Sequence, residues 1–206
     1  MKNNLSQSKN IIRFLNEAGK LKQAIRFREE KRMPKDSAAD HSWRTALMVL
    51  VVADNLKLKI NIEKALAIAI LHDLVEAVVG NTDYILIAEK KISKNQKKLL
   101  ENKAINKLSR LLPASSGKKV YRLWNEYESN STKEAKFVQA LNKLETLIYL
   151  SEVGYKNYDK PEFIPNYADK AVNNFPALKP FLKEVKDELK KEFKKGGIVW
   201  RKNYDN

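Results

Sequence analysis

The chain has 206 residues, of which 43% are hydrophobic, enough to bury a core and too many for a disordered chain. It contains no cysteine, which excludes disulfide bonds, a thiolate nucleophile and a zinc–thiolate site. Its formal charge of +15 is spread along the sequence, which we interpret as a solvated cationic surface. The N-terminus lacks the apolar run of a signal peptide, and the apolar stretch 65–71 is too short to span a bilayer. We therefore expect a cytoplasmic protein with no membrane partner.

Helical periodicity dominates the sequence, and no segment alternates as a β-strand does. Ser6 or Ser8 is the expected N-cap of the first helix, and Gly19 is its expected stop. The elements expected in the first quarter of the chain are a helix over 9–18, a short helix over 21–27, a loop over 36–40 and a helix over 41–56. In the last of these, Ala46, Leu47, Leu50 and Val51 recur at the spacing of one helix face.

The next helix, capped by Asn61, is apolar on nearly all sides from Ala65 to Leu71. A helix of this kind lies in the centre of a domain. We expect it to continue through His72 and to end at Gly80.

The second half of the chain predicts further helices, two of which begin with a capping box. These helices run from the box of Ser93 and Gln96 to about Leu112, over 116–128, from the box of Ser131 and Glu134 to Gly154, over 162–174 and over 176–195. The predicted fold class is therefore all-α. We expect a single domain over residues 1–206, with a core over about 8–195 and a short C-terminal tail.

The two histidines, His41 and His72, both lie in the apolar N-terminal half, and Asp73 follows His72 directly. A buried carboxylate is costly unless a partner compensates its charge. A divalent transition metal is such a partner, because it binds both imidazole and carboxylate. The alternative is a hydrogen-bonded His-Asp pair that only ends a helix. Glu76 lies one turn after His72, so their side chains share a face.

Three separated segments carry a resemblance to a known family. HDLVEAVVG over 72–80 closely resembles the signature of HD-domain metal-dependent phosphohydrolases. DSAADHS over 36–42 resembles the segment with that family's first metal histidine, and EAKFVQALNKLE over 134–145 resembles the helix with its last ligand. The resemblance extends from Leu15 to about Phe193. It is greatest to the 5′-deoxynucleotidase branch, especially over 111–137.

The resemblance implies a cofactor and a set of site residues. One divalent transition metal, which is Co, Mn, Zn, Fe or Ni, would be held by His41, His72, Asp73 and Asn142. Glu76 matches the acidic residue that positions or deprotonates water. Arg26 matches an arginine that contacts the phosphate, and Phe27 a ring that crowds the sugar. The alternatives are a surface cation for Arg26 and core packing for Phe27.

Two asparagines stand where the family has aspartates. Asn142 can coordinate a metal through its carbonyl oxygen but brings no charge, so metal affinity should fall. Asn81, at the second catalytic position, cannot act as a carboxylate base or orienting group. If Asn142 is not a ligand, it is a polar residue on a helix surface.

The function predicted from these residues is a 5′-nucleotidase that releases phosphate from deoxynucleoside or nucleoside 5′-monophosphates. The first alternative is an HD protein that binds a nucleotide with weakened or no catalysis. The second is a phosphohydrolase that acts on nucleoside triphosphates or on another phosphate ester. A nucleic-acid-binding protein would fit the charge, but the sequence has no recognised motif for it. The resemblance also implies a homodimer, for which a surface with Tyr149, Tyr155 and Tyr158 is the candidate.

Overall fold

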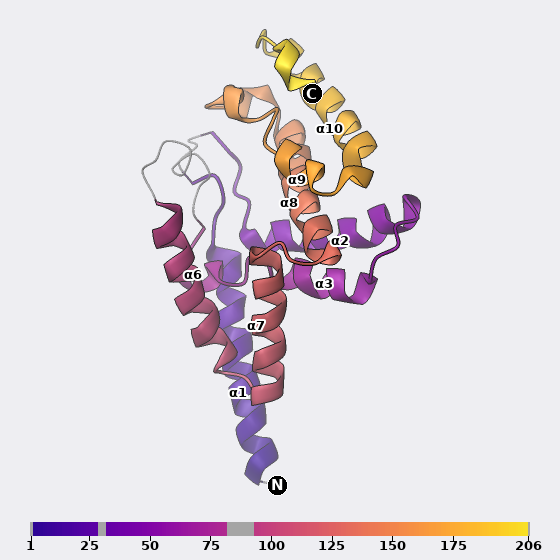
Figure 1. The fold of residues 1–206 in the computed structure, drawn as a ribbon. Helices are drawn as coiled ribbons and strands as arrows, with labels where there is room; N and C mark the ends of the chain where they lie inside the picture. The colour runs from indigo at the N-terminus through magenta and orange to yellow at the C-terminus, as the bar shows by residue number, and fades with distance from the viewer. Residues whose placement is uncertain (1, 29–31, 82–92, 206) are drawn as a thin grey trace.

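The computed structural model describes residues 2–28, 32–81 and 93–205, and Figure 1 shows their arrangement. The described residues form helices and one isolated bridge between Ile25 and Ser37, which confirms the all-α prediction. The α-helices are α1 (Lys2–Ala18), α2 (Ala38–Asn55), α3 (Ile62–Leu71), α4 (Glu76–Val79), α6 (Lys94–Ser109), α7 (Ala114–Glu128), α8 (Lys133–Val153), α9 (Asp169–Asn173) and α10 (Lys179–Lys195). Short 3₁₀ helices are η1 (Gly19–Gln23), η2 (Tyr155–Asn157), η3 (Pro161–Phe163), η4 (Pro176–Leu178) and η5 (Lys202–Tyr204).

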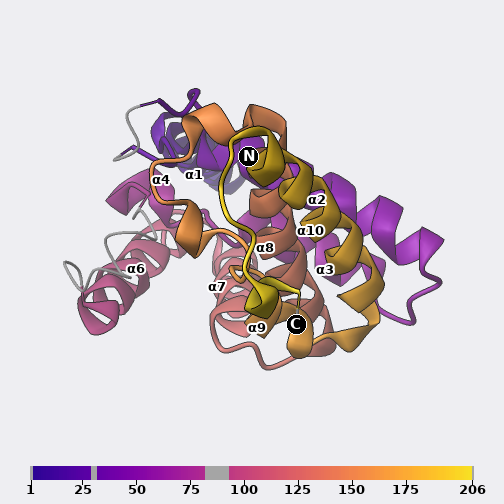
Figure 2. The ribbon, with the colours of Figure 1, turned by 90° about the horizontal axis from the view of Figure 1, so that it is seen from above.

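Helix α8 is the central helix of the fold. Its side chains are buried along most of its length, and α2, α3 and α10 all pack against it. Figure 1 shows α2 and α3 side by side at one end of α8, and α10 alongside α8 toward its other end. A second apolar cluster, which includes Ile105 and Trp124, joins α6 and α7 to the segment after α3. Seen from above in Figure 2, α4 and α6 lie on one side of α8, and α2 and α3 on the other.

The helix expected from Asn61 to Gly80 is interrupted. Asn61 caps α3 as predicted, but α3 ends at Leu71, and α4 begins only at Glu76. The His72 imidazole donates from Nδ1 to the carbonyl oxygen of Ala69, at 2.7 Å, and so occupies an acceptor at the end of α3. The backbone then turns, with Glu76 N–H donating to Asp73 O at 2.9 Å. This turn lets two consecutive side chains, His72 and Asp73, face the same point.

Helix α2 begins earlier than predicted, so the loop expected over 36–40 is wrong in its second half. Ser37 is the N-cap, and its hydroxyl accepts from Asp40 N–H at 3.1 Å, while the Asp40 carboxylate accepts from Ser37 N–H at 3.1 Å. This capping box places His41 in the first turn of α2.

The short helix expected over 21–27 is also wrong. The structure has η1, followed by extended chain that pairs with residues 36–38. Arg26 N–H donates to Asp36 O, and Ala38 N–H donates to Ala24 O, each at 2.8 Å. These tertiary hydrogen bonds replace those of a helix, and they hold residues 24–26 beside the N-cap of α2.

The buried face of α2 differs from the predicted one. Leu47, Leu50 and Val51 are 44%, 47% and 52% exposed, whereas Met48 and Val49 belong to the core. The helix is apolar on several sides, so periodicity alone does not select its inner face. The orientation that is observed turns His41 inward.

Several helix boundaries also need correction. Helix α1 begins at Lys2, ahead of Ser6 and Ser8, so neither serine caps it. Helix α6 ends at Ser109, and α7 begins at Ala114. Thr132, one residue after the expected Ser131, caps α8 and accepts from Ala135 N–H. Residues 162–174 and 176–195 each divide into a 3₁₀ helix and an α-helix. None of the described helices is long and apolar enough to cross a bilayer.

The tyrosine surface expected for a dimer is not present as predicted. Tyr158 is buried and donates its hydroxyl hydrogen to Leu150 O at 2.7 Å. The Tyr149 ring stacks on Phe27, with 5.5 Å between the ring centroids. These tyrosines pack within the chain, and the homodimer stays a prediction.

Candidate active site

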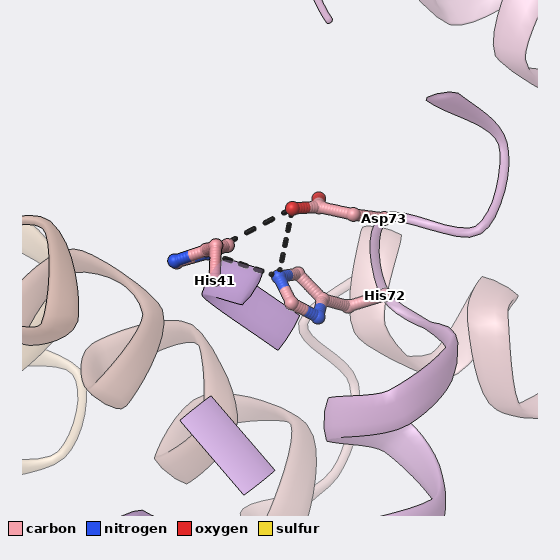
Figure 3. A group of neighbouring side chains, drawn as sticks. All are labelled: His41, His72 and Asp73. Atoms are coloured by element: carbon pink, nitrogen blue, oxygen red, sulfur yellow. Dashed lines mark hydrogen bonds and ion pairs between the residues drawn. The ribbon is translucent and has the colours of Figure 1, made fainter. Parts of the chain in front are cut away.

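His41, His72 and Asp73 converge where α2 meets the turn after α3 (Figure 3). The two Nε2 atoms are 3.3 Å apart, and the Asp73 Oδ2 atom lies 3.1 Å from His72 Nε2 and 3.7 Å from His41 Nε2. Both histidines are almost fully buried, whereas the Asp73 carboxylate is partly exposed. The three potential ligand atoms therefore surround one point that can be reached from the cavity.

The outer ring nitrogens show that this donor set fits a metal ion. His41 Nδ1 is hydrogen-bonded to the Glu145 carboxylate, and His72 Nδ1 to the Ala69 carbonyl, both of which accept only. In each neutral ring the Nε2 lone pair is therefore directed to the other ring and to Asp73. Two lone pairs and a carboxylate at this separation are compensated either by a proton on His72 Nε2 or by a metal ion between them. Histidine ligands held through their outer nitrogen in this way are typical of protein metal sites.

The electrostatics favour neutral His41 and ionised Asp73. Burial, reinforced by the Arg26 charge, lowers the pKa of His41 to about 4. Burial opposes ionisation of Asp73, but His72, His41 and Arg26 outweigh it and hold the pKa of this carboxyl below its usual range. Burial would lower the pKa of His72, yet Asp73 outweighs it and raises that pKa. A cation shared by His72 and Asp73 is therefore favoured, and a divalent metal competes with the proton for this position.

Glu145 on α8 contacts His41 at the ring nitrogen that faces away from His72 and Asp73. The sequence analysis did not assign it a role. Its buried carboxylate accepts hydrogen bonds from His41 Nδ1, from Arg44 Nε at 2.9 Å and from Arg26 Nη1 at 3.3 Å. Burial would raise the pKa of Glu145, but His41 and the two arginines hold it at about 2. Glu145 thus stays ionised, and it fixes both the tautomer and the orientation of His41.

Glu76 and Asn81 form a pair beside Asp73. The Asn81 Nδ2 donates to both carboxylate oxygens of Glu76, at 3.0 and 2.9 Å. Asn81 therefore contacts Glu76 as an amide donor, and it has no carboxylate with which to act as a base. Burial and the Asp73 charge raise the pKa of Glu76 well above its ordinary value, and the Asn81 bonds oppose that shift.

Asn142 is buried on α8 and lines the same cavity, so it is not on the helix surface. Its Nδ2 donates to the hydroxyl of Tyr127 at 2.7 Å. The Tyr127 ring in turn packs against His72, with 5.1 Å between the ring centroids. With its amide nitrogen engaged in this way, Asn142 has its carbonyl oxygen as the group available to a metal.

Arg26 and Phe27 lie between η1 and α2, at the border of the cavity. Arg26 is 8% exposed, so it is not a surface cation. Its guanidinium donates to Asp36 at 2.6 Å and to Thr146 Oγ1 at 2.8 Å, besides Glu145. Phe27 is buried in the core cluster and also lines the cavity, so it can pack in the core and contact a ligand in the cavity.

One cavity of about 290 Å³ brings together all the residues singled out from the sequence. Its lining includes Arg26, Phe27, His41, His72, Asp73, Glu76, Asn81 and Asn142. It also includes residues that the sequence analysis missed, namely Lys97, Glu101, Tyr127, Glu128, Gln139, Lys143, Thr146 and Tyr167. Gln139 and Thr146 lie three and four residues from Asn142 on α8, so helical spacing was an available signal for them. Lys143 directly follows Asn142, and spacing did not single it out. The others come from α6, α7 and the segment before α9.

Comparison with known proteins gives the family. A model of the HD domain matches residues 18–179. The chain belongs to the HD-domain family. It is 30% identical over 188 residues to the human protein named 5′-deoxynucleotidase HDDC2, covering 88% of this chain and 87% of that one. It is also 30% identical over 192 residues to the Schizosaccharomyces pombe protein named 5′-deoxynucleotidase hdd1, covering 90% and 93% of the two chains.

Solved structures share the fold. A protein from Magnetospirillum magnetotacticum, described as a predicted metal-dependent phosphohydrolase, aligns with a TM-score of 0.73 at 24% identity, covering 95% of this chain and 100% of that one. A conserved hypothetical protein from Pyrococcus furiosus aligns with a TM-score of 0.64 at 31% identity, over 85% of this chain and 99% of that one. The arrangement of helices around the HD motif is thus common to these proteins and to this chain.

The position of Glu145 predicts the effect of neutralising it. Glu145→Gln should lower the free energy of unfolding by about 3 kcal/mol, because buried Arg26 loses part of its compensation. Because folding lowers the pKa of Glu145, its carboxylate contributes its full stability above pH 4.5, and this stability is lost as the pH falls toward 2. Urea unfolding of both proteins at several pH values measures this.

Glu152→Gln is the matched control. Glu152 also pairs with Arg44, at 2.5 Å, but its side chain is 54% exposed. Its loss should cost less than about 1 kcal/mol. Equal destabilisation by the two substitutions would contradict the role given to Glu145.

Proposed function

We propose that this HD-domain phosphohydrolase removes the phosphate from deoxynucleoside 5′-monophosphates. The observation that carries the proposal is the convergence of two imidazole Nε2 atoms and the Asp73 carboxylate on one point at the edge of a cavity. The names of the relatives, 5′-deoxynucleotidases over most of the chain, support this choice of substrate.

The metal would be held by His41, His72 and Asp73, with the carbonyl oxygen of Asn142 as a fourth ligand. When bound, a divalent metal polarises a phosphoryl oxygen and lowers the pKa of water. Glu76, held by Asn81, orients the attacking water and takes its proton. Burial and the Asp73 charge raise its pKa above the ordinary value, which makes it a stronger base than a free carboxylate. The products are a nucleoside and inorganic phosphate.

The size of the cavity supports a small substrate. Ligand sites usually have volumes of about 300–1,000 Å³, and this cavity, at about 290 Å³, is at the lower limit. A mononucleotide fits such a volume better than a triphosphate does. Phe27, fixed by stacking on Tyr149, offers a rigid apolar wall against which a 2′-hydroxyl would be desolvated. This supports a preference for deoxyribose.

Phosphate release from a panel of deoxynucleoside and nucleoside monophosphates tests the proposal. With Mn²⁺, Co²⁺ or Zn²⁺ added, we expect release that depends on the metal and is faster for the deoxy substrates. Glu76→Gln should lower kcat by about 10²–10⁴, because a general base is lost. Asn142→Asp should raise metal affinity by about 10–100-fold, because it restores a charged ligand.

The outcomes separate the enzyme from a nucleotide-binding protein. Activity only in Asn142→Asp would mean that asparagine at this position has disabled the enzyme, which would then bind nucleotides without hydrolysing them. Release of phosphate only from other phosphate esters would reject the nucleotide substrate. Unchanged turnover in Glu76→Gln would contradict the role of that carboxylate.

The Asn81–Glu76 contact predicts a shift in the pH profile. Asn81→Ala removes two hydrogen bonds that lower the pKa of Glu76. The base is active when ionised, so activity falls as the pH falls through this pKa. The acidic limb of kcat/KM should therefore move to higher pH in the variant. Asn106→Ala, at an exposed position of α6, is the control. An unshifted limb in Asn81→Ala would contradict the assignment.

A further inference from the structure

Three cations of the described residues line the cavity: Arg26, Lys97 and Lys143. A phosphate monoester carries a charge of about −1.5 to −2 at neutral pH. Cationic side chains bind it through charge-assisted hydrogen bonds, and a cation without a carboxylate partner has more donors and charge to offer. The partners of the three cations therefore decide which of them can bind it.

Arg26 and Lys97 are already paired with carboxylates. Arg26 Nη1 donates to Asp36 and Glu145, and its Nη2 donates to Thr146 Oγ1. The Lys97 ammonium is paired with Glu101, four residues further along α6. Both charges are thus compensated within the fold.

Lys143 is held differently. Its ammonium donates to the hydroxyl of Tyr167 at 2.9 Å and lies 4.6 Å from the centre of that ring. Both contacts are with a phenol side chain and orient the ammonium, and no carboxylate among the described residues forms an ion pair with it. Lys143 lines the same cavity as His72 and Asp73, so its ammonium and the candidate metal ligands border one space.

We propose that Lys143 binds the non-bridging oxygens of the substrate phosphate, beside the metal. The proposal rests on the proposed function, in which the substrate is a phosphate monoester. Tyr167 positions the ammonium over the cavity, and Lys143 exchanges this hydroxyl contact for the phosphate. Arg26 then positions His41 through Glu145. Lys143, in place of Arg26, contacts the phosphate.

Calorimetric titration of the Mn²⁺-loaded protein with inorganic phosphate tests the proposal without needing a nucleotide. Lys143→Ala should raise the Kd for phosphate about 10- to 100-fold, the loss expected for one charge-assisted hydrogen bond. Lys143→Arg should restore part of the affinity, because it keeps the charge. Lys136→Ala is the control, since it removes the same charge from an exposed position of α8.

The outcomes distinguish this proposal from the proposed function. Equal phosphate affinity in Lys143→Ala and the unmodified protein would overturn it, whatever the nucleotidase activity. So would a loss of thermal stability shared by Lys143→Ala and Tyr167→Phe without a change in Kd, which is the result for a structural tether. Phosphate binding that depends on Lys143, in a protein that hydrolyses no nucleotide, would support the proposal and reject the nucleotidase function.

Discussion

The Glu145 carboxylate is buried in α8, and three side chains from the segments 26–44 donate to it. A buried charge of this kind is tolerated only when its partners compensate it. His41, Arg26 and Arg44 do so together, and the same contacts fix the orientation of α2 on α8. The face of α2 that turns inward is therefore the one that bears His41, even though Leu47 and Leu50 remain exposed. The position of the first histidine thus depends on an ion network in the core.

The second half of the site depends on a local break in the helix. His72 uses its own Nδ1 to occupy a carbonyl at the end of α3, and the chain turns before α4 begins. Without this turn, His72 and Asp73 would point in directions about 100° apart around a helix. With it, both reach the same point as His41. Two constraints therefore form the site. The long-range contacts of Glu145 orient His41, and the local turn after α3 orients His72 and Asp73 toward the same point.

The sequence predicted the all-α fold and half of the residues that line the cavity, because the HD motif and its flanking segments have a distinctive order and spacing. It did not predict the break after Leu71, since apolar periodicity continues on both sides of it. Nor did it predict the role of Glu145, which lies 104 residues from His41 and contacts it only in the folded chain. It identified Asn81 as the loss of a carboxylate but did not predict that this amide donates to both carboxylate oxygens of Glu76. Such contacts depend on tertiary placement, which residue type and spacing do not specify.

The central claim is that one divalent metal lies between His41, His72 and Asp73. The most direct test is an anomalous difference map, recorded at the metal's absorption edge from crystals grown with Mn²⁺ or Co²⁺. We predict a single strong peak within bonding distance of both Nε2 atoms and of an Asp73 oxygen, and no such peak in crystals of the His72→Ala variant. A map in which the two imidazoles contact each other without a metal peak, or in which the metal lies elsewhere, would contradict the account.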